Sequence, residues 1–265
     1  MIGAVIGDIA GSRFEFNNFR SKNFTLITRE CFPTDDSFMT IAIGKAILDC
    51  HENYADLSNF AIKNMQMFGR RYPYGGYGGM FRHWLTDKNP QPYNSFGNGA
   101  AMRVSGAGFA ARSLEEAKEL ARKVTMVTHN HPEGLKGAEA VAVAIYLARN
   151  NKSLEEIKAY INKNYYKTDF TLDEIRPRYT FNETCQGSVP QAFEAFFESD
   201  DFEDAIKNAV SIGGDSDTIA AITGGIAEAY YGVPLYWRLT AENLLDNEEY
   251  GYALAWLDKF EELYP

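Results

Sequence analysis

Hydrophobic residues recur along the chain at helical spacing, and the alternation typical of strands is almost absent. Residues 37–50 (SFMTIAIGKAILDC) are apolar on nearly every side, which predicts a deeply buried helix. Residues 134–149 are also apolar and are rich in small side chains, which let neighbouring helices approach closely. The helical pattern continues through residues 189–231, where Gly232 and Pro234 are stop signals. The pattern therefore predicts an all-α protein.

Polar residues mark where several of these helices begin. Residues 113–116 and 153–156 both read SLEE, the pattern of a capping box. A short β segment is possible near residues 179–181, but nothing in the sequence supports a sheet. No linker, low-complexity tract or long repeat interrupts the chain. We therefore expect one compact domain spanning residues 1–265, built as an orthogonal bundle of many helices.

The composition narrows the partners that the protein can have. Its formal net charge of -10 argues against general binding to nucleic acid or to anionic membranes. The three cysteines lack metal-ligand spacing, which indicates free thiols in a reducing compartment. The apolar N-terminal segment has no basic region like that of a signal peptide, and no apolar run reaches membrane-spanning length. We expect a cytoplasmic protein that is a monomer and does not bind membranes.

Two short acidic segments stand where apolar helices are about to begin. The first acidic segment is Thr34–Ser37 (TDDS), and the second is Gly213–Thr218 (GGDSDT). Either segment alone is explained by helix capping, because Asp and Ser side chains accept hydrogen bonds from free backbone N–H groups. Capping uses one side chain, however, and both segments carry a surplus of oxygen ligands. If the two helix starts meet, their carboxylates would repel one another unless a cation lies between them.

Such a site would favour hard metal ions. Carboxylate and hydroxyl oxygens suit Mg²⁺, Mn²⁺ or Ca²⁺ better than zinc. Four carboxylates could hold two ions a few ångströms apart, an arrangement used in hydrolytic reactions.

Five motifs in a fixed order give the chain a resemblance to a known family. They are GDIAGSRFE (Gly7–Glu15), the first acidic segment, SFGNGAAMR (Ser95–Arg103), THNHPEGLKGA (Thr128–Ala138) and GGDSDTIA (Gly213–Ala220). Each is weak alone, but together the five resemble the ADP-ribosylglycohydrolase family. That family includes the dinitrogenase reductase-activating glycohydrolases and the ADP-ribosyl-arginine and ADP-ribosyl-serine hydrolases.

The resemblance implies an all-α fold and a dinuclear Mg²⁺ or Mn²⁺ centre at the helix N-termini. It also implies that Glu15 lies on a mobile loop that approaches the metals when substrate is absent. Ser37 and Ser216 stand where many family members have Thr, but neither is an expected ligand. The metal ligands that the resemblance implies are Thr34, Asp35, Asp36, Asp215, Asp217 and Thr218.

The implied activity is a Mg²⁺-dependent ADP-ribosyl hydrolase. It would cleave the glycosidic bond between the distal ribose of ADP-ribose and an acceptor, which is a protein side chain or another group. Glycoside cleavage usually depends on paired carboxylates. We assign catalysis to Glu15, Asp35 and Asp36, with Asp35 or Asp36 as the acid–base group. The sequence leaves open which of these two aspartates moves the proton.

The substrate-binding residues are expected around Ser95–Gly99 (SFGNG). Backbone N–H groups of Gly97, Asn98 and Gly99 could face the pyrophosphate from the start of a helix, with Ser95 and Phe96 beside them. Taken alone, the G-N-G sequence is better explained as an ordinary turn, but the resemblance also implies a role in binding phosphate. The resemblance also places His129 near substrate, whereas a zinc site with His131 lacks further ligands at a familiar spacing.

The aromatic, glycine-rich stretch Arg70–Trp84 has two readings. It could be a lid whose Tyr74 or Tyr77 stacks on adenine, or a loop folded over the core. We take Tyr77 as the candidate for substrate binding.

Two other functions remain open at this point. One is a non-catalytic relative that binds ADP-ribose, although all the expected ligands and Glu15 are present. The other is a metal-dependent phosphohydrolase acting on nucleotides, which would use the same oxygen-rich site. The sequence does not distinguish Mg²⁺ from Mn²⁺ and does not identify the acceptor.

Overall fold

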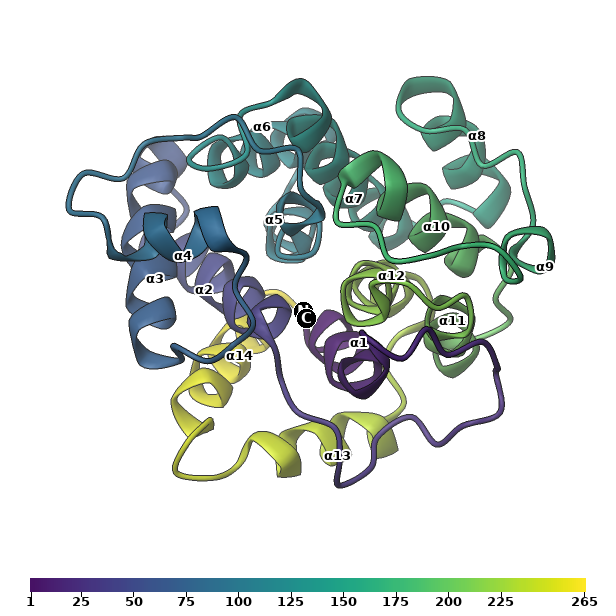
Figure 1. Ribbon diagram of the computed structural model, residues 1–265. Coiled ribbons are helices and arrows are strands. Elements are labelled where there is room, and N and C mark those ends of the chain that lie inside the picture. Colours follow the sequence, from purple (N-terminus) through teal and green to yellow (C-terminus); the bar gives the residue numbers. More distant parts are fainter.

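Helices surround a central pair, α1 and α12, in the computed structural model, which describes all residues from Met1 to Pro265 (Figure 1). No β-strand forms, so the all-α prediction is confirmed. The α-helices are α1 (Ile2–Gly11), α2 (Asp35–Asp49), α3 (Leu57–Arg71), α4 (Gly79–Thr86), α5 (Ser105–Ala110), α6 (Leu114–Thr125), α7 (Pro132–Arg149), α8 (Leu154–Asn164), α9 (Leu172–Ile175), α10 (Cys185–Phe197), α11 (Phe202–Ser211), α12 (Ser216–Tyr231), α13 (Leu235–Leu245) and α14 (Gly251–Leu263).

Glycines on one face of α1 allow an unusually close approach to α12. A Cβ atom added at Gly7 would lie 2.0 Å from the carbonyl oxygen of Ala220, and one added at Gly11 would lie 2.5 Å from the Cα atom of Asp217. Real Cβ atoms do not approach backbone atoms this closely, so only glycine fits at these positions. The close packing brings Asp8 on α1 beside the start of α12.

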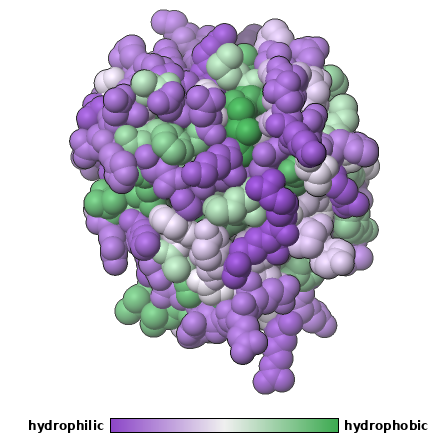
Figure 2. Space-filling view, turned by 90° about the vertical axis from the view of Figure 1, so that its left-hand side faces the viewer, coloured by the Kyte–Doolittle hydropathy of each residue, from purple (hydrophilic) through white to green (hydrophobic).

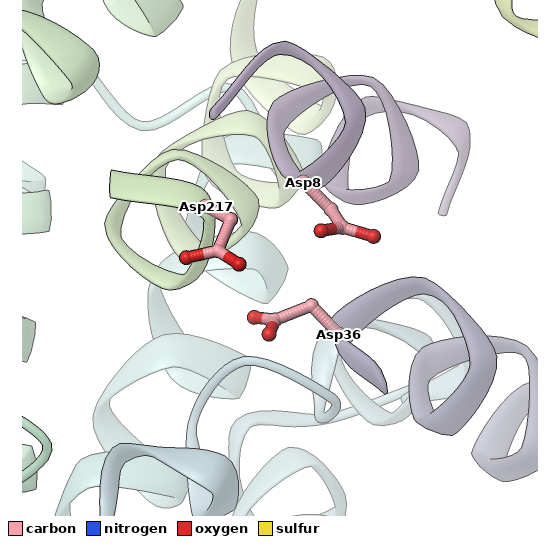
Figure 3. A group of neighbouring side chains, drawn as sticks. All are labelled: Asp8, Asp36 and Asp217. Carbon is pink, nitrogen blue, oxygen red and sulfur yellow. The ribbon is translucent and has the colours of Figure 1, made fainter. Parts of the chain in front are cut away.

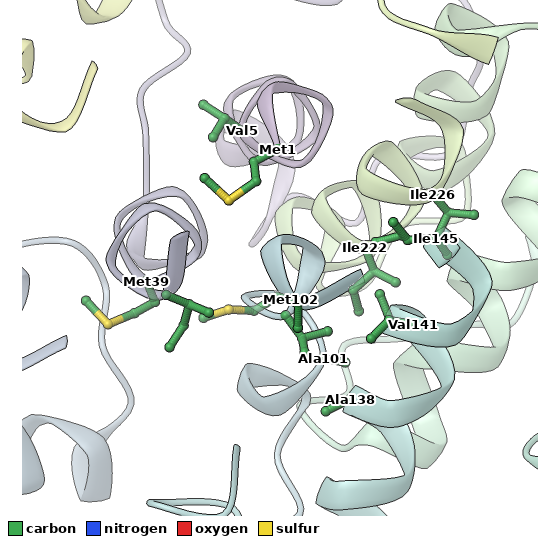
Figure 4. Close-up of a cluster of buried hydrophobic side chains, with 14 of the residues drawn as sticks. Met1, Val5, Met39, Ala101, Met102, Ala138, Val141, Ile145, Ile222 and Ile226 are labelled. Atoms are coloured by element: carbon green, nitrogen blue, oxygen red, sulfur yellow. The ribbon is translucent and has the colours of Figure 1, made fainter. Parts of the chain in front are cut away.

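The apolar core joins this central pair to the helices around it. Figure 4 shows Ala138, Val141 and Ile145 of α7 near Ile222 and Ile226 of α12. All five side chains are buried. Helix α2 is also buried along most of its length, as its nearly uniform apolar sequence predicts, and it begins at Asp35. These neighbours hold the first turns of α2 and α12 in fixed positions.

The two expected capping boxes differ in the structure. Ser153 and Glu156 form the complete reciprocal pair at the start of α8. Ser113 accepts a hydrogen bond from the backbone N–H of Glu116, but the Glu116 carboxylate accepts from Arg112 instead of the Ser113 backbone. The neighbouring guanidinium is a charged donor, and it makes a stronger bond than a backbone amide.

The β segment considered possible at residues 179–181 does not form. Its place is taken by an extended loop, held by a hydrogen bond from the Tyr179 hydroxyl to the carbonyl of Gly187 (2.7 Å). The one β-type pairing is an isolated bridge between Gly97 and Thr184. This bridge matters for the site, because it joins two loops that are far apart in the sequence.

The surface fits the acidic, polar composition of the chain. The face in Figure 2 is mostly hydrophilic, with only scattered hydrophobic groups. The three cysteines are free and buried. None of the helices is both long enough and apolar enough to pass through a lipid bilayer.

Candidate active site

The two acidic segments meet at the N-termini of α2 and α12. Thr218 on α12 donates a hydrogen bond from its hydroxyl to Oδ2 of Asp36 on α2, at 3.2 Å. Thr34 caps α2 by accepting a hydrogen bond from the backbone N–H of Asp36. Gly213 and Gly214 have φ values of +74° and +75°, and this left-handed backbone leads the chain tightly into α12.

Another carboxylate, that of Asp8, joins the two helix starts from α1 (Figure 3). Its side chain accepts from the backbone N–H of Thr34 (2.8 Å), the Thr34 hydroxyl (2.6 Å), the backbone N–H of Ser37 (3.0 Å) and the Ser37 hydroxyl. Asp8 thus fixes the turn that carries the first acidic segment. This role was not predicted from the sequence, although a lone carboxylate within an apolar helix is a visible signal.

The first group of carboxylates consists of Asp8, Asp36 and Asp217, which point toward one another from three helices (Figure 3). One oxygen from each lies within 4.8 Å of the other two. Four hydrogen bonds already occupy Asp8, whereas the buried Oδ1 atom of Asp36 has no hydrogen-bond partner. An orphaned buried carboxylate oxygen is costly unless a cation binds it. The donor set therefore fits a hard divalent cation.

A second group consists of Glu15, Asp215 and Asp217, whose oxygens also lie within 4.8 Å of one another. Asp217 belongs to both groups and links them. Asn98 donates a hydrogen bond to Oδ2 of Asp215 at 2.6 Å, which orients that carboxylate. These two clusters of carboxylates, which have Asp217 in common, could hold two neighbouring cations.

The crowding of these carboxylates changes their acidity. Burial and neighbouring charges raise the pKa of Asp35 to about 8 and that of Glu15 to about 7. Burial raises the pKa of Asp8 to about 6, although its hydrogen bonds oppose the rise. The pKa values of Asp36 and Asp217 are also raised, by burial first and then by adjacent carboxylates. Without a cation, these groups cannot all ionise together at neutral pH.

We predict that the metal-free protein loses stability as the pH rises. The folded state binds protons more tightly than the unfolded chain, because the folded pKa values lie near 6, 7 and 8 and the ordinary values near 4. The contribution of these three protonated carboxyl groups to the free energy of unfolding is therefore complete at about pH 4 and is lost by about pH 8. Thermal unfolding in EDTA should show a falling melting temperature between pH 5.5 and pH 8, and the stabilisation by Mg²⁺ should grow over the same range. A melting temperature in EDTA that rises over this range would contradict the prediction.

The carboxylates form one end of a cleft of about 290 Å³. Its other walls come from the G-N-G turn (Gly97–Gly99), His129 and the first residues of α4. Arg103 is the one Arg or Lys side chain in the wall. The acidic residues that line the cleft are Glu15, Asp35, Asp36, Glu183, Asp215 and Asp217.

Some of the expected site residues do not line this cleft. Thr34 lies behind it, where its hydroxyl bonds to Asp8. The Tyr77 ring is only 3% exposed and lies 5.9 Å from the Phe81 ring, measured between centroids. The Phe96 ring contacts His131 instead, at 5.1 Å. The rings of Tyr77 and Phe96, both expected near substrate, therefore lie outside the cleft wall.

The stretch Arg70–Trp84 is also not a single loop. Helix α3 continues to Arg71, and α4 begins at Gly79. Phe81 on α4 lines the cleft, although its sequence gives no sign of that position. Gly78 and Gly79, two glycines of this stretch, stand at the start of α4.

The G-N-G turn differs from the expected row of free backbone amides. The N–H of Gly97 donates to the Ser95 hydroxyl (3.1 Å), and that of Asn98 donates to the carbonyl of Glu183 (2.8 Å). Only the N–H of Gly99 makes no hydrogen bond within the protein. The turn is a single 3-10 turn and not the start of an α-helix. At this turn, therefore, only the Gly99 N–H is free to donate to a ligand.

The fold and this cleft together define a class of protein: an all-α protein with clustered carboxylates at its helix N-termini that could hold metal ions. The family model for ADP-ribosylglycohydrolase matches residues 1–262. The chain therefore belongs to the ADP-ribosylglycohydrolase family. Members of this family are hydrolases that depend on metal ions.

Individual relatives agree with this assignment. ADP-ribosylhydrolase ARH3 of Xenopus tropicalis is 27% identical over 96% of this chain and 93% of its own length. ARH3 of Homo sapiens is 26% identical over 91% of this chain and 88% of its own length. ADP-ribosylarginine hydrolase Tri1 of Pseudomonas putida is 25% identical over 88% of this chain and 70% of its own length.

A solved structure supports the fold. One chain of an ADP-ribosylglycohydrolase-related protein complex superposes with a TM-score of 0.67 and 22% identity. The match covers 96% of this chain and 94% of the other.

Proposed function

We propose that the protein is a Mg²⁺- or Mn²⁺-dependent ADP-ribosyl hydrolase that releases ADP-ribose from a modified acceptor. The observation that carries the proposal is the presence of two clusters of carboxylate side chains at one end of a cleft. Asp217 belongs to both clusters. The family membership and the ARH3 and Tri1 relatives support the glycosidic reaction.

The residues that would hold the metal ions are Asp36, Asp215, Asp217 and Thr218, with Asp35 and Thr34 as the remaining expected ligands. The orphaned Oδ1 atom of Asp36 supports this set. When bound, two divalent ions supply Lewis-acid polarisation, orientation of substrate hydroxyls and a more acidic bound water.

Thr34 contributes mainly by positioning. Its hydroxyl already donates to Asp8 at 2.6 Å and lies 3.5 Å from Oδ2 of Asp36.

Asp35 is the better candidate for the group that protonates the departing acceptor. It lines the cleft, and its carboxylate makes no hydrogen bond with another side chain. By contrast, Oδ2 of Asp36 accepts from Thr218 and faces the other carboxylates. A catalytic acid must be protonated at the working pH, and burial, the largest influence on the pKa of Asp35, favours its protonated form.

The acceptor would leave past the rim near Glu15. Phe16, the next residue, is 82% exposed, and its ring stacks on that of Phe181 at 5.9 Å between centroids. Phe181 and Glu183 both line the cleft. Glu15 belongs to the second carboxylate group, so this rim lies just outside the proposed reaction centre.

The function is tested by following ADP-ribose release from ADP-ribosylated arginine, serine and nucleic acid. We expect release from at least one acceptor in Mg²⁺ or Mn²⁺, its abolition by EDTA, and its recovery when metal is restored. Phosphate release from nucleotides without glycosidic cleavage would identify a phosphohydrolase instead. Tight ADP-ribose binding without turnover of any substrate would identify a binding protein and overturn the proposal.

A further inference from the structure

Arg103 is a buried cation in the cleft wall that forms no ion pair with an acidic side chain. Its residue is only 1% exposed, and none of its nitrogen atoms forms an ion pair with a carboxylate. The Nε atom has no hydrogen-bond partner. A buried charge without a counter-ion is expensive, so its retention calls for a specific task.

The guanidinium contacts His129 both directly and through Thr128. Nη2 of Arg103 donates to the Thr128 hydroxyl at 2.6 Å and lies 3.4 Å from Nδ1 of His129. The Thr128 hydroxyl oxygen lies 2.7 Å from the same Nδ1 atom. The other acceptor within reach of the Thr128 hydroxyl is the carbonyl of Thr125, at 3.4 Å.

These contacts determine which ring nitrogen of His129 carries the proton. A guanidinium can only donate, so the lone pair and not a hydrogen must face it from Nδ1. The Thr128 hydroxyl accepts from Arg103 and has one hydrogen to give, and Nδ1 is its nearest acceptor. This arrangement of donors and acceptors favours the tautomer with the ring proton on Nε2. Burial and the adjacent Arg103 also lower the pKa of His129, which keeps the ring neutral.

The Nε2 atom lies beside the G-N-G turn. It is 3.4 Å from the position that a Cβ atom would take on Gly99 and 3.5 Å from that on Gly97. No protein group forms a hydrogen bond with it, and His129 lines the cleft. Because the Gly97 and Asn98 amides are occupied, Nε2–H and the Gly99 N–H are the donors left at this turn.

We propose that Arg103 is a positioning residue that acts through Thr128 to hold His129 as a fixed Nε2–H donor for an anionic oxygen of the substrate. The role assigned to the substrate rests on the proposed function. The tautomer itself follows from the protein contacts alone. The arrangement sets the direction of one hydrogen bond before the ligand arrives, which reduces the ordering that binding requires.

The tautomer is tested by nitrogen NMR of the protein labelled at its histidine rings. We expect Nδ1 of His129 to resonate as an unprotonated nitrogen and Nε2 as a protonated one. Thr128→Val removes the hydroxyl and should populate the other tautomer or broaden the signals, whereas Thr128→Ser should restore the wild-type ring shifts. Arg103→Met should shift the ring toward Nδ1–H if it folds, and the Thr128 pair keeps the test decisive if it does not. A protonated Nδ1 in the wild type, or identical ring shifts in Thr128→Val, would overturn the proposal.

The link to substrate is tested by the affinity for ADP-ribose. A hydrogen bond to a charged group is worth about 1.5–3 kcal/mol, so Thr128→Val should weaken binding about 10-fold or more and raise KM more than it lowers kcat. Thr128→Ser should recover most of the loss. If the wild type does not bind ADP-ribose, the proposed function fails, but the ring shifts can still be read. If ADP-ribose binds equally to the wild type and Thr128→Val, the inference fails and the proposed function stands.

Discussion

Asp217→Asn should abolish nearly all turnover of an ADP-ribosylated substrate in saturating Mg²⁺. Asp217 is the one carboxylate common to both groups, so its loss leaves each group incomplete. Metal ions supply several kcal/mol of charge stabilisation in such reactions, and each 1.36 kcal/mol is a factor of ten in rate. We therefore expect kcat/KM to fall about 10³-fold or more, measured as ADP-ribose released per unit time. The stabilisation by Mg²⁺ in thermal unfolding should disappear with it.

The same substitution should have the opposite effect on the metal-free protein. Burial and the charges of Asp36 and Asp215 raise the pKa of Asp217, so the ionised group destabilises the fold. Asparagine keeps the size and removes the charge. In EDTA at pH 8, Asp217→Asn should therefore melt at a higher temperature than the wild type. The matched control is Asp246→Asn, because Asp246 is exposed after α13 and lies outside the cleft.

An enzyme that gains metal-free stability when it loses activity would show that the carboxylates are kept for function. Two results would contradict this reading. One is an unchanged response to Mg²⁺ in Asp217→Asn, and the other is a loss of turnover in Asp246→Asn that equals the loss in Asp217→Asn.

Local sequence rules predicted the helices well because the signals are themselves local. The apolar run of α2 and the glycines before α12 determine where each helix begins, and the acidic residues stand at those starts. The contact between the first turns of α2 and α12, however, depends on tertiary packing. It depends on Gly7 and Gly11, which let α1 pack against α12 and align α2 with it through Asp8.

The detailed roles at the G-N-G turn could not be predicted in this way. The sequence shows three residues able to offer amides, but their partners come from elsewhere. The carbonyl of Glu183 occupies the Asn98 amide, and Asp215 accepts from the Asn98 side chain. Glu183 and Asp215 lie 85 and 117 residues from Asn98 in the sequence, so no local sequence pattern predicts these contacts. Arg103 belonged to a recognised motif, yet its significance appears only once Thr128 and His129 lie against it.

The glycine face of α1 leads to the second large prediction, which concerns the fold itself. Gly7→Ala should destabilise the protein by about 3 kcal/mol or more, at the upper end of the cost of overpacking a core. The added methyl group would meet the carbonyl oxygen of Ala220 at 2.0 Å. This obstacle is backbone within a buried helix, so it cannot rotate away as a flexible side chain could. Urea unfolding followed by circular dichroism measures the effect.

Gly251→Ala is the matched control for that experiment. Gly251 begins α14, and a Cβ atom there would meet nothing within 4 Å. Alanine in a helix is favoured over glycine by roughly 0.5–1 kcal/mol, so this variant should be neutral or slightly more stable. Equal stability of the two variants would show that α1 and α12 do not need their close contact.

Gly7→Ala should also weaken the metal site without changing any of its ligands. Moving α1 away from α12 displaces Asp8, which holds the turn of the first acidic segment through Thr34 and Ser37. The separation between Asp36 and Asp217 would then change. In the fraction that folds, a higher Mg²⁺ concentration should be needed for half-maximal stabilisation than in the wild type or Gly251→Ala. A destabilised Gly7→Ala protein with wild-type Mg²⁺ affinity would mean that the site assembles from α2 and α12 alone, independently of how tightly α1 packs.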